Sequence, residues 1–311
     1  MFVKHIIIDT DAGHDDVMAI AWLLNKPEIC IEAVTVCNGL AHVDAGAETI
    51  ARLFAATGHN IPVYAGHPQA VQGNRSFPAT WRAISDSLAQ GLSVTKTGQV
   101  EPENAVSFLL RRCTAPAEPL HILALGPLTN LALVYRQNPA AFKTIHEITL
   151  MGGAFHVPGN VHDYEEFVSP TNLVEWNLFV DPFAVQLVCQ SGVPLTFIPL
   201  DATNKVRLTA QFVEQFTTLP LNVAGTMVRA ILQSIRHRLA GGEYYAWDPL
   251  AAVALVEKTI LNFKEITFDV VTSGPNAGQT RCAETGRSHA RVALDADGSR
   301  FFNHFITSLT N

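Results

Sequence analysis

The sequence has no apolar stretch of the ~18 residues that a membrane-spanning helix needs. It also has no block of like charges, a feature typical of surfaces that bind nucleic acids or membranes. The formal net charge of −7 further disfavours a partner with a phosphate backbone. These absences predict a protein that works with neither a membrane nor a nucleic acid.

Paired cysteines are also missing. The chain contains five cysteines, and their odd number and scattered positions fit neither a disulfide framework nor a zinc site. They are Cys30, Cys37, Cys113, Cys189 and Cys282. Such thiols are typical of a reducing compartment, so we predict a cytoplasmic protein.

Internal repeats and low-complexity linkers are absent, while hydrophobic residues make up 48% of the 311 residues, enough for a large core. Strand-like and helix-like segments alternate, as in βαβ units of a parallel sheet. Residues 6–8 and 122–125 are continuously apolar, which indicates strands covered on both faces. We predict one α/β domain over residues 1–311, with an open, mostly parallel, twisted sheet flanked by helices.

This alternation assigns most of the chain to strands or helices. The expected strands lie at residues 2–9, 30–37, 62–65, 120–125, 147–151 and 194–200. The expected helices include residues 15–25, 44–57, 104–113, 182–189 and 221–239. Residues about 68–103 and 154–170 are polar, loop-rich insertions, and long loops in compact domains often bind ligands.

The most informative feature is an acidic turn near the start of the chain. Asp9, Asp11, Asp15 and Asp16 lie within eight residues, between an apolar strand and a helix. So much negative charge at one turn is costly unless a cation lies among it. Carboxylate oxygens suit a divalent metal ion, and a metal in a crevice indicates an enzyme.

A helix cap or an EF-hand loop accounts for this acidic turn less well than a metal site does. A cap explains Asp15 or Asp16 but not all four acids. An EF-hand loop is excluded because its sixth position is His14 instead of glycine, and its twelfth is Ile20 instead of an acid.

A phosphohydrolase of the haloacid-dehalogenase type remains an alternative, with Asp9 as nucleophile in an Asp-x-Asp motif. It leaves Asp15 and Asp16 unexplained, and no later strand ends in the paired acids that such enzymes use for magnesium.

Polar or glycine-rich segments follow several of the expected strands. They are residues 9–16, 38–39, 126–127 and 151–153. Open parallel sheets bind ligands at the carboxyl ends of their strands, so we expect these segments to meet in a polar, metal-binding crevice.

With these motifs in view, the sequence resembles the nucleoside hydrolase family, whose signature is Asp-x-Asp-Pro-Gly-x-Asp-Asp. The match is residues 9–16, with Ala12 in place of the usual proline. Further motifs follow in the family's order at residues 125–130, 151–153, 175–177 and 247–250. The resemblance implies the nucleoside hydrolase fold with its Rossmann-like core.

The family binds one Ca²⁺ ion and hydrolyses the N-glycosidic bond of ribonucleosides to ribose and free base. The resemblance implies that Ca²⁺ is held by Asp11, Asp16, Asp248 and the backbone carbonyl of Leu125. Leu125 replaces a threonine that is common there, a change that a carbonyl ligand tolerates. Asp11 is also implied as the catalytic general base.

The resemblance also implies a set of residues that bind the substrate. Four of them hold the ribose hydroxyls: Asp15, Asn160, Glu175 and Asn177. The others are Asn38, Trp81, Met151 and Trp247.

Two tryptophans resemble those of the purine-specific branch of the family, which acts on inosine, adenosine and guanosine. Many members have a histidine before the late aspartate as general acid, but this chain has Trp247 before Asp248. Residues 77–82 and 243–248 resemble the purine branch, in which Trp81 and Trp247 would sandwich the base. Asn38 stands where that branch carries an aspartate.

The sequence therefore predicts a Ca²⁺-dependent purine nucleoside hydrolase. A broad or pyrimidine-preferring hydrolase remains an alternative, as does a non-catalytic nucleoside or ribose sensor, although the intact acidic set disfavours a sensor. The resemblance implies a homodimer, or a tetramer as elsewhere in the family.

Overall fold

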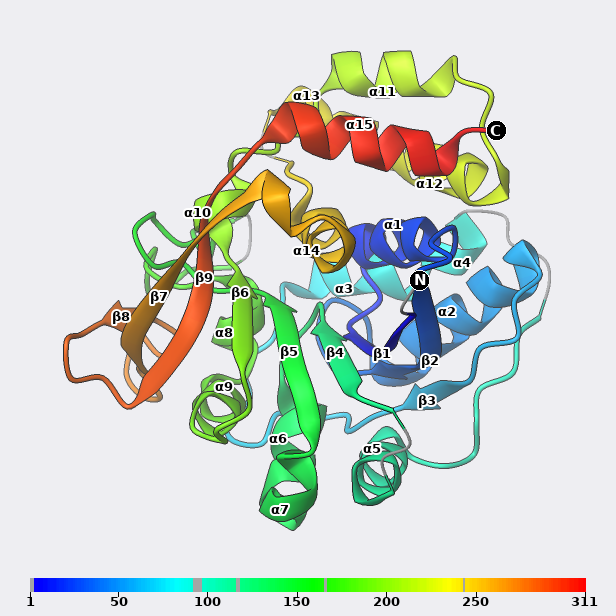
Figure 1. Cartoon of the computed structure of the whole chain (residues 1–311). Helices are drawn as coiled ribbons and strands as arrows, with labels where there is room; N and C mark the ends of the chain where they lie inside the picture. Colours follow the sequence, from blue (N-terminus) through cyan, green and yellow to red (C-terminus); the bar gives the residue numbers. More distant parts are fainter. Residues whose placement is uncertain (1–2, 92–96, 116–117, 165–166, 243) are drawn as a thin grey trace.

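One sheet runs through the part of the chain that the computed structural model describes, residues 3–91, 97–115, 118–164, 167–242 and 244–311. Its nine described strands follow the order β3-β2-β1-β4-β5-β6-β9-β7-β8 (Figure 1). The strands are β1 (Lys4–Thr10), β2 (Ile29–Val36), β3 (Val63–Ala65), β4 (Leu120–Ala124), β5 (Ile145–Met151), β6 (Leu195–Ile198), β7 (Leu261–Val270), β8 (Thr280–Cys282) and β9 (Ser288–Ala296). Phe2 and Glu243, which belong to segments assigned above, lie outside the described residues.

Strand pairing is parallel from β3 through β6 and on to β9, whereas β7 pairs antiparallel with both β8 and β9. The prediction of an open, mostly parallel sheet is therefore confirmed. The antiparallel edge was not predicted. There β7 and β8 form a hairpin, and β9 returns along the other side of β7 without a helical crossover in residues 271–287.

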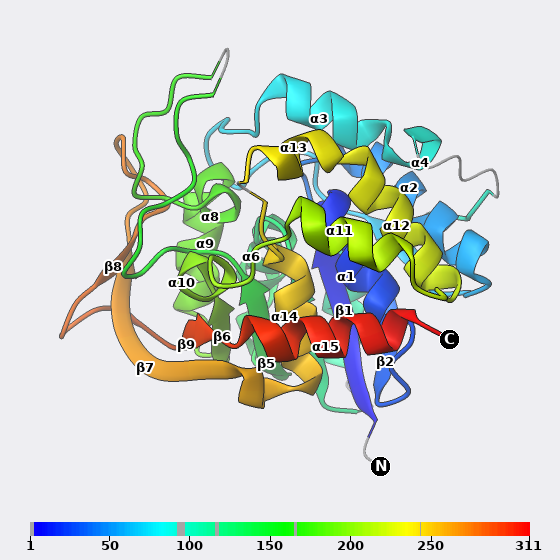
Figure 2. The same ribbon diagram turned by 90° about the horizontal axis from the view of Figure 1, so that it is seen from above.

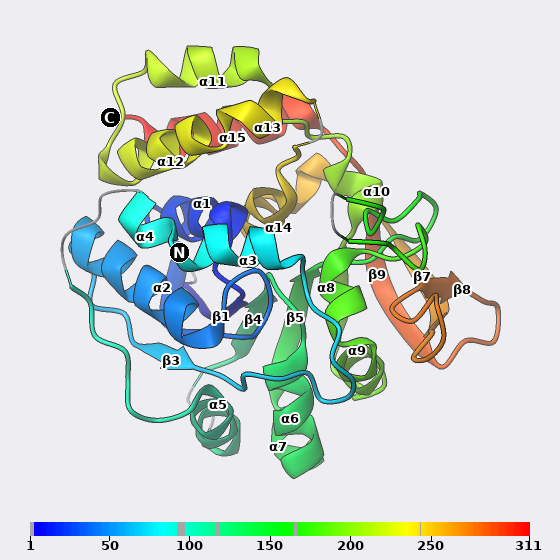
Figure 3. The same ribbon diagram turned by 180° about the vertical axis from the view of Figure 1, so that it is seen from behind.

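Helices cover both faces of the sheet (Figures 1 and 3). One face carries α1 (His14–Leu23), α2 (Val43–Thr57), α12 (Val223–Ser234), α14 (Trp247–Val256) and α15 (Gly298–Leu309). The other carries α5 (Ala105–Thr114), α6 (Thr129–Gln137), α7 (Pro139–Phe142) and α9 (Pro182–Cys189). Ile6 and Ile8 pack in the first core and Ile7 in the second, so the apolar run of β1 is buried on both faces as predicted.

The remaining helices lie around the carboxyl edge of the sheet or over the first core (Figures 1 and 2). They are α3 (Ala79–Asp86), α4 (Leu88–Gly91), α8 (Trp176–Val180), α10 (Leu200–Thr203), α11 (Ala210–Thr217), α13 (Arg236–Ala240) and the 3₁₀ turn η1 (Lys258–Ile260). None of the described helices combines the length and apolar character that crossing a membrane requires.

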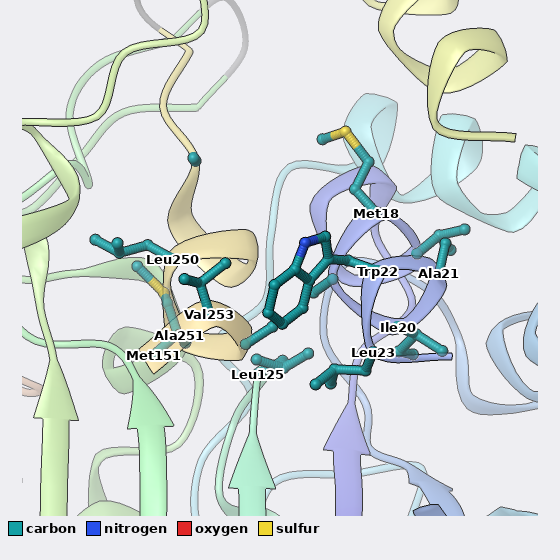
Figure 4. Packing of buried hydrophobic residues seen from close by; sticks show 14 of the residues in the cluster. Met18, Ile20, Ala21, Trp22, Leu23, Leu125, Met151, Leu250, Ala251 and Val253 are labelled. Carbon is teal, nitrogen blue, oxygen red and sulfur yellow. The ribbon is translucent and has the colours of Figure 1, made fainter. Parts of the chain in front are cut away.

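Helices α1 and α14 pack side by side although they come from opposite ends of the chain (Figure 4). Met18 and Trp22 of α1 and Leu250 and Val253 of α14 all belong to the first core. Trp22 is 1% exposed, so it serves to pack α1 into this core. This contact brings the first turns of the two helices to the same end of the sheet.

Two expectations about individual segments were wrong in detail. Residues 79–86 and 88–91 of the first loop-rich insertion are helical. The long helix expected over 221–239 is divided at Ile235 into α12 and α13. The hydroxyl of Ser234 donates a hydrogen bond to the Ile231 carbonyl at 2.7 Å, a local contact that bends helices.

Ala12 has a φ of 58°, in the left-handed region that disfavours a residue with a β-carbon by about 1–2 kcal/mol. The proline ring holds φ at about −65°, so the motif's usual proline does not fit this backbone.

We expect Ala12→Pro to lower the free energy of unfolding by about 3 kcal/mol or more, and Ala12→Gly to change it by less than about 1 kcal/mol. Urea unfolding measures both, and a proline variant as stable as the wild type would contradict this backbone conformation.

Candidate functional site

Three buried carboxylates meet where α1 and α14 begin. Asp15 and Asp16 lie in the first turn of α1, and Asp248 lies in the first turn of α14. One carboxylate oxygen from each lies within 4.8 Å of the others. The positive ends of two helix dipoles offset part of this charge, but they do not cancel it.

Asp11 lies beside this group, in the turn that leads into α1. Its Oδ2 accepts a hydrogen bond from the Leu40 amide at 2.8 Å. A β-carbon at Gly39 would lie 2.1 Å from the same oxygen, and one at Gly126 would lie 2.9 Å from the Asp11 β-carbon. The loops after β2 and β4 therefore close on Asp11 because both carry glycine, as expected for strand ends that share one edge.

Backbone and hydroxyl groups orient Asp16. The Gly13 amide donates to its Oδ2 at 2.9 Å, and the Thr10 hydroxyl donates to its Oδ1. Both donors come from the same turn, so the short motif orients its own carboxylate.

Burial and mutual repulsion make this cluster hard to ionise. Burial, followed by repulsion from Asp16, holds the pKa values of Asp11 and Asp248 well above the ordinary range. The same two causes raise the pKa of Asp15 to about 7. A divalent cation with oxygen ligands would remove this penalty, so the donor set fits such an ion.

Asp9, the remaining acid of the turn, has a different role. It accepts hydrogen bonds from the Thr35 hydroxyl at 2.6 Å and the Asn130 amide at 2.9 Å. Burial raises the pKa of Asp9 to about 7. This carboxyl links β1 to β2 and α6, and so it connects elements of the fold.

Asn177 joins the ends of β4 and β5. Its Nδ2 donates to the Leu125 carbonyl at 2.9 Å and to the Met151 carbonyl at 3.2 Å. The side chains of Leu125 and Met151 both belong to the first core, and Met151 lies beside Leu250 of α14 (Figure 4). Leu125 therefore offers the site only its backbone oxygen, and a carbonyl oxygen has a second lone pair for another partner.

Glu175 caps the amino end of α8. Its carboxylate accepts hydrogen bonds from the amides of Gly153, Asn177 and Leu178 at 3.0–3.3 Å. Burial raises the pKa of Glu175 to about 7 in spite of these donors. Asn160, in the second insertion, accepts from the Trp176 amide at 3.1 Å, so its loop is fastened to the same helix.

Trp81 and Trp247 belong to two separate aromatic groups. Trp81 lies 4.9 Å from Tyr164 and 5.4 Å from Trp176 between ring centroids, while Trp247 lies 4.9 Å from Tyr244. The guanidinium of Arg238, on α13, lies 5.3 Å from the Trp81 ring and 5.2 Å from the Tyr244 ring. No ring contact joins the two tryptophans within the described ranges, and Arg238 bridges their groups.

Sequence reasoning missed two residues that shape this edge. Asp201 accepts hydrogen bonds from the amides of Phe155 and His156 at 2.9 and 2.8 Å, which holds the start of the second insertion. Its position just after a predicted strand could have pointed to it. Arg82 donates to the Asn38 carbonyl oxygen, and no signal in the sequence pairs these two residues.

Comparisons with known proteins agree with this geometry. The family model described as inosine-uridine preferring nucleoside hydrolase matches residues 6–303. The pyrimidine-specific ribonucleoside hydrolase RihB of Shigella sonnei (strain Ss046) is 30% identical over 310 residues, which cover 96% of this chain and 95% of that protein.

Solved structures give the same result. The inosine-uridine preferring nucleoside hydrolase from Bacillus anthracis has a TM-score of 0.86 at 26% identity, covering 98% of this chain and 99% of that one. The purine-preferring ribonucleoside hydrolase from Gardnerella vaginalis has a TM-score of 0.81 at 27% identity, covering 98% of both chains.

These names include both base classes, so the similarity does not distinguish a purine from a pyrimidine substrate. It does establish an enzyme that cleaves nucleosides rather than a sensor or a phosphohydrolase. The chain, with the predicted nucleoside hydrolase fold, is a member of the inosine-uridine preferring nucleoside hydrolase family.

Proposed function

We propose that this enzyme is a Ca²⁺-dependent purine ribonucleoside hydrolase that releases ribose and the free base. The observation that carries the proposal is the buried carboxylate cluster at the first turns of α1 and α14. Family membership supports nucleoside cleavage, and the donor set supports the choice of ion.

In this proposal Asp11, Asp16, Asp248 and the Leu125 carbonyl hold the Ca²⁺ ion. All are oxygen donors, and Ca²⁺ accepts six to eight of them in flexible geometry. When bound, the ion offsets the negative charge and makes a nearby water more acidic. The Asn177 amide fixes the orientation of the Leu125 carbonyl through its 2.9 Å hydrogen bond.

Asp11 acts as the general base. It takes one proton from the attacking water, whose oxygen bonds to the anomeric carbon as the carbon–nitrogen bond to the base breaks. The electron pair of that bond passes to the base, which then takes a proton from solvent. The Leu40 amide keeps Asp11 in one orientation, so no reorganisation is needed during the reaction.

Four residues are proposed to bind the ribose hydroxyls: Asp15, Asn160, Glu175 and Asn177. Met151 is proposed only as a further substrate-binding residue. Glu175 and Asn177 are already fixed by backbone hydrogen bonds around α8. Nearby carboxylates also stabilise the positive charge that develops on the sugar ring in an oxocarbenium-like transition state.

Trp81 and Trp247 are proposed to stack on the purine from the two aromatic groups. The indole nitrogen of Trp247 is buried and has no hydrogen-bond partner among the described residues, so it can donate to a ligand. Stacking contributes about 1–3 kcal/mol per base and favours the larger purine ring system.

A broad or pyrimidine-preferring hydrolase is the second candidate. The pyrimidine-specific relatives favour it, as does Asn38, which cannot supply the negative charge of the aspartate in the purine branch.

We also propose a homodimer located in the cytoplasm. The resemblance to the purine branch supports a dimer. The free cysteines support a reducing compartment, where thiols stay unpaired.

Removing the ion should make stability depend strongly on pH. A carboxyl group whose pKa is raised in the folded state, such as Asp15 at about 7 against an ordinary 3.8, destabilises the fold as pH rises between those values. His14, whose pKa burial lowers to about 4, acts in the opposite direction, but five of the acids described above have raised pKa values: Asp9, Asp11, Asp15, Glu175 and Asp248. We expect the Tm of the chelator-treated protein to fall from pH 4 to pH 7.

At pH 7.5, Ca²⁺ at about 100 times its Kd should raise that Tm by about 5 °C. Asp16→Asn should abolish this rise, whereas Asp44→Asn, which changes an exposed acid of α2, should keep it. Differential scanning calorimetry measures the Tm of the wild type and of both variants with and without Ca²⁺. A wild-type Tm that does not change when Ca²⁺ is added would refute the ion site.

Replacing the general base should remove turnover. We expect Asp11→Asn to lower kcat for inosine by about 10³-fold or more, because the attacking water then keeps its proton. A reducing-sugar assay over a nucleoside panel measures released ribose, with Asp44→Asn as the control. An Asp11→Asn enzyme within tenfold of the wild type would argue against the mechanism, and a wild type that releases no ribose would argue against the function.

Loss of stacking should affect purines more than pyrimidines. We expect Trp81→Ala to lower kcat for inosine by about 10- to 100-fold and kcat for uridine by a smaller factor, while Trp81→Phe retains most activity. Parallel steady-state kinetics on the two nucleosides give the comparison. Equal losses on both would count against the proposed role of Trp81.

A further inference from the structure

Asn38 lies at the carboxyl end of β2, directly before the loop that closes on Asp11. Gly39 and the Leu40 amide both touch the Asp11 carboxylate. Asn38 is therefore two residues from a contact with the proposed general base, and its side chain is half-buried at this edge.

Arg82 reaches Asn38 from α3. Its Nη2 donates a hydrogen bond to the Asn38 Oδ1 at 2.6 Å, and its Nε is buried without a hydrogen-bond partner among the described residues. One turn later on the same helix, Asp86 accepts from the His42 backbone amide at 2.8 Å and from its Nδ1 at 2.7 Å. Helix α3 is thus fastened to the start of α2, and Arg82 is held in reach of Asn38.

This contact fixes which way round the Asn38 amide lies. A guanidinium group carries only hydrogen-bond donors, so Asn38 must offer it the carbonyl oxygen and not the NH₂ group. In the part of the chain that the structure describes, no protein group accepts a hydrogen bond from the Asn38 Nδ2. Two N–H donors therefore stay available for a ligand beside Asp11.

Purine and pyrimidine nucleosides share one acceptor next to the bond that breaks. Purine N3 and pyrimidine O2 both lie two bonds from the glycosidic nitrogen, and both carry lone pairs. Negative charge develops on these atoms as the base leaves with the electron pair of the glycosidic bond. An N–H donor stabilises that charge.

We propose that Arg82 is a positioning residue that locks the Asn38 amide with its NH₂ group toward the leaving base, so that Asn38 serves purine and pyrimidine nucleosides alike. The proposal rests on the proposed nucleoside hydrolysis. It makes base activation by Asn38 common to both classes, while the preference for purines arises from stacking at Trp81 and Trp247.

The test compares kcat and KM for inosine and uridine in Arg82 variants. Arg82→Met keeps the length of the side chain but removes its donors, so the Asn38 amide is free to turn. We expect kcat to fall by about 10²-fold for both nucleosides, the loss typical of one transition-state donor, with KM changed less than about threefold. Arg82→Lys, which again carries only donors, should restore kcat to within about tenfold of the wild type.

Two further variants separate this role from a structural one. Arg111→Met removes an exposed arginine of α5 that is paired with Glu103, and it should leave kcat and KM unchanged. Asn38→Leu removes the N–H donors and keeps a side chain of similar size, so it should lose kcat on both nucleosides even if Arg82→Met fails to fold.

The results can also overturn the proposal. An Arg82→Met or Asn38→Leu enzyme with wild-type kcat on either nucleoside overturns it, and so does a lysine variant no better than the methionine variant. Since these outcomes need an active wild type, they differ from failure of the proposed function, in which the wild type itself releases no ribose.

Discussion

The structure depends on one electrostatic constraint, the burial of four like-charged carboxylates at one edge of a parallel sheet. The fold imposes this arrangement, because the apolar packing of α1 against α14 fixes where Asp15, Asp16 and Asp248 meet. The glycines at 39 and 126 let two further strand ends close on Asp11. Core packing therefore holds together charges that would otherwise separate, and the proposed divalent cation would offset their repulsion.

Around this cluster the fold places groups that are oriented before any substrate binds. Backbone amides orient Glu175, and the side chain of Asn177 bonds to two strand-end carbonyls. Arg82 holds Asn38 in the same way. Such preorganisation suits a reaction in which positive charge grows on the sugar and negative charge on the departing base. In the proposed mechanism, the two aromatic groups that Arg238 bridges would serve the base side of this division.

Much of this arrangement follows from local sequence. The apolar run at 6–8 identifies a buried strand, and helix α9 has the predicted bounds, because both patterns depend on neighbouring residues only. The antiparallel edge of β7, β8 and β9 and the division at Ile235 did not follow, since each depends on contacts between distant segments or on one local hydrogen bond. For the same reason Arg82 could not be paired with Asn38: the contact exists only after α3 docks against α2.

The central claim is that the buried acids form one divalent-cation site per chain. Isothermal titration calorimetry of the chelator-treated protein with Ca²⁺ at pH 7.5 tests it most directly. The account predicts one ion bound per chain, with protons released on binding because the acids have raised pKa values without the ion, and no binding to Asp248→Asn. Absence of binding at millimolar Ca²⁺, or binding that Asp248→Asn leaves unchanged, would contradict it.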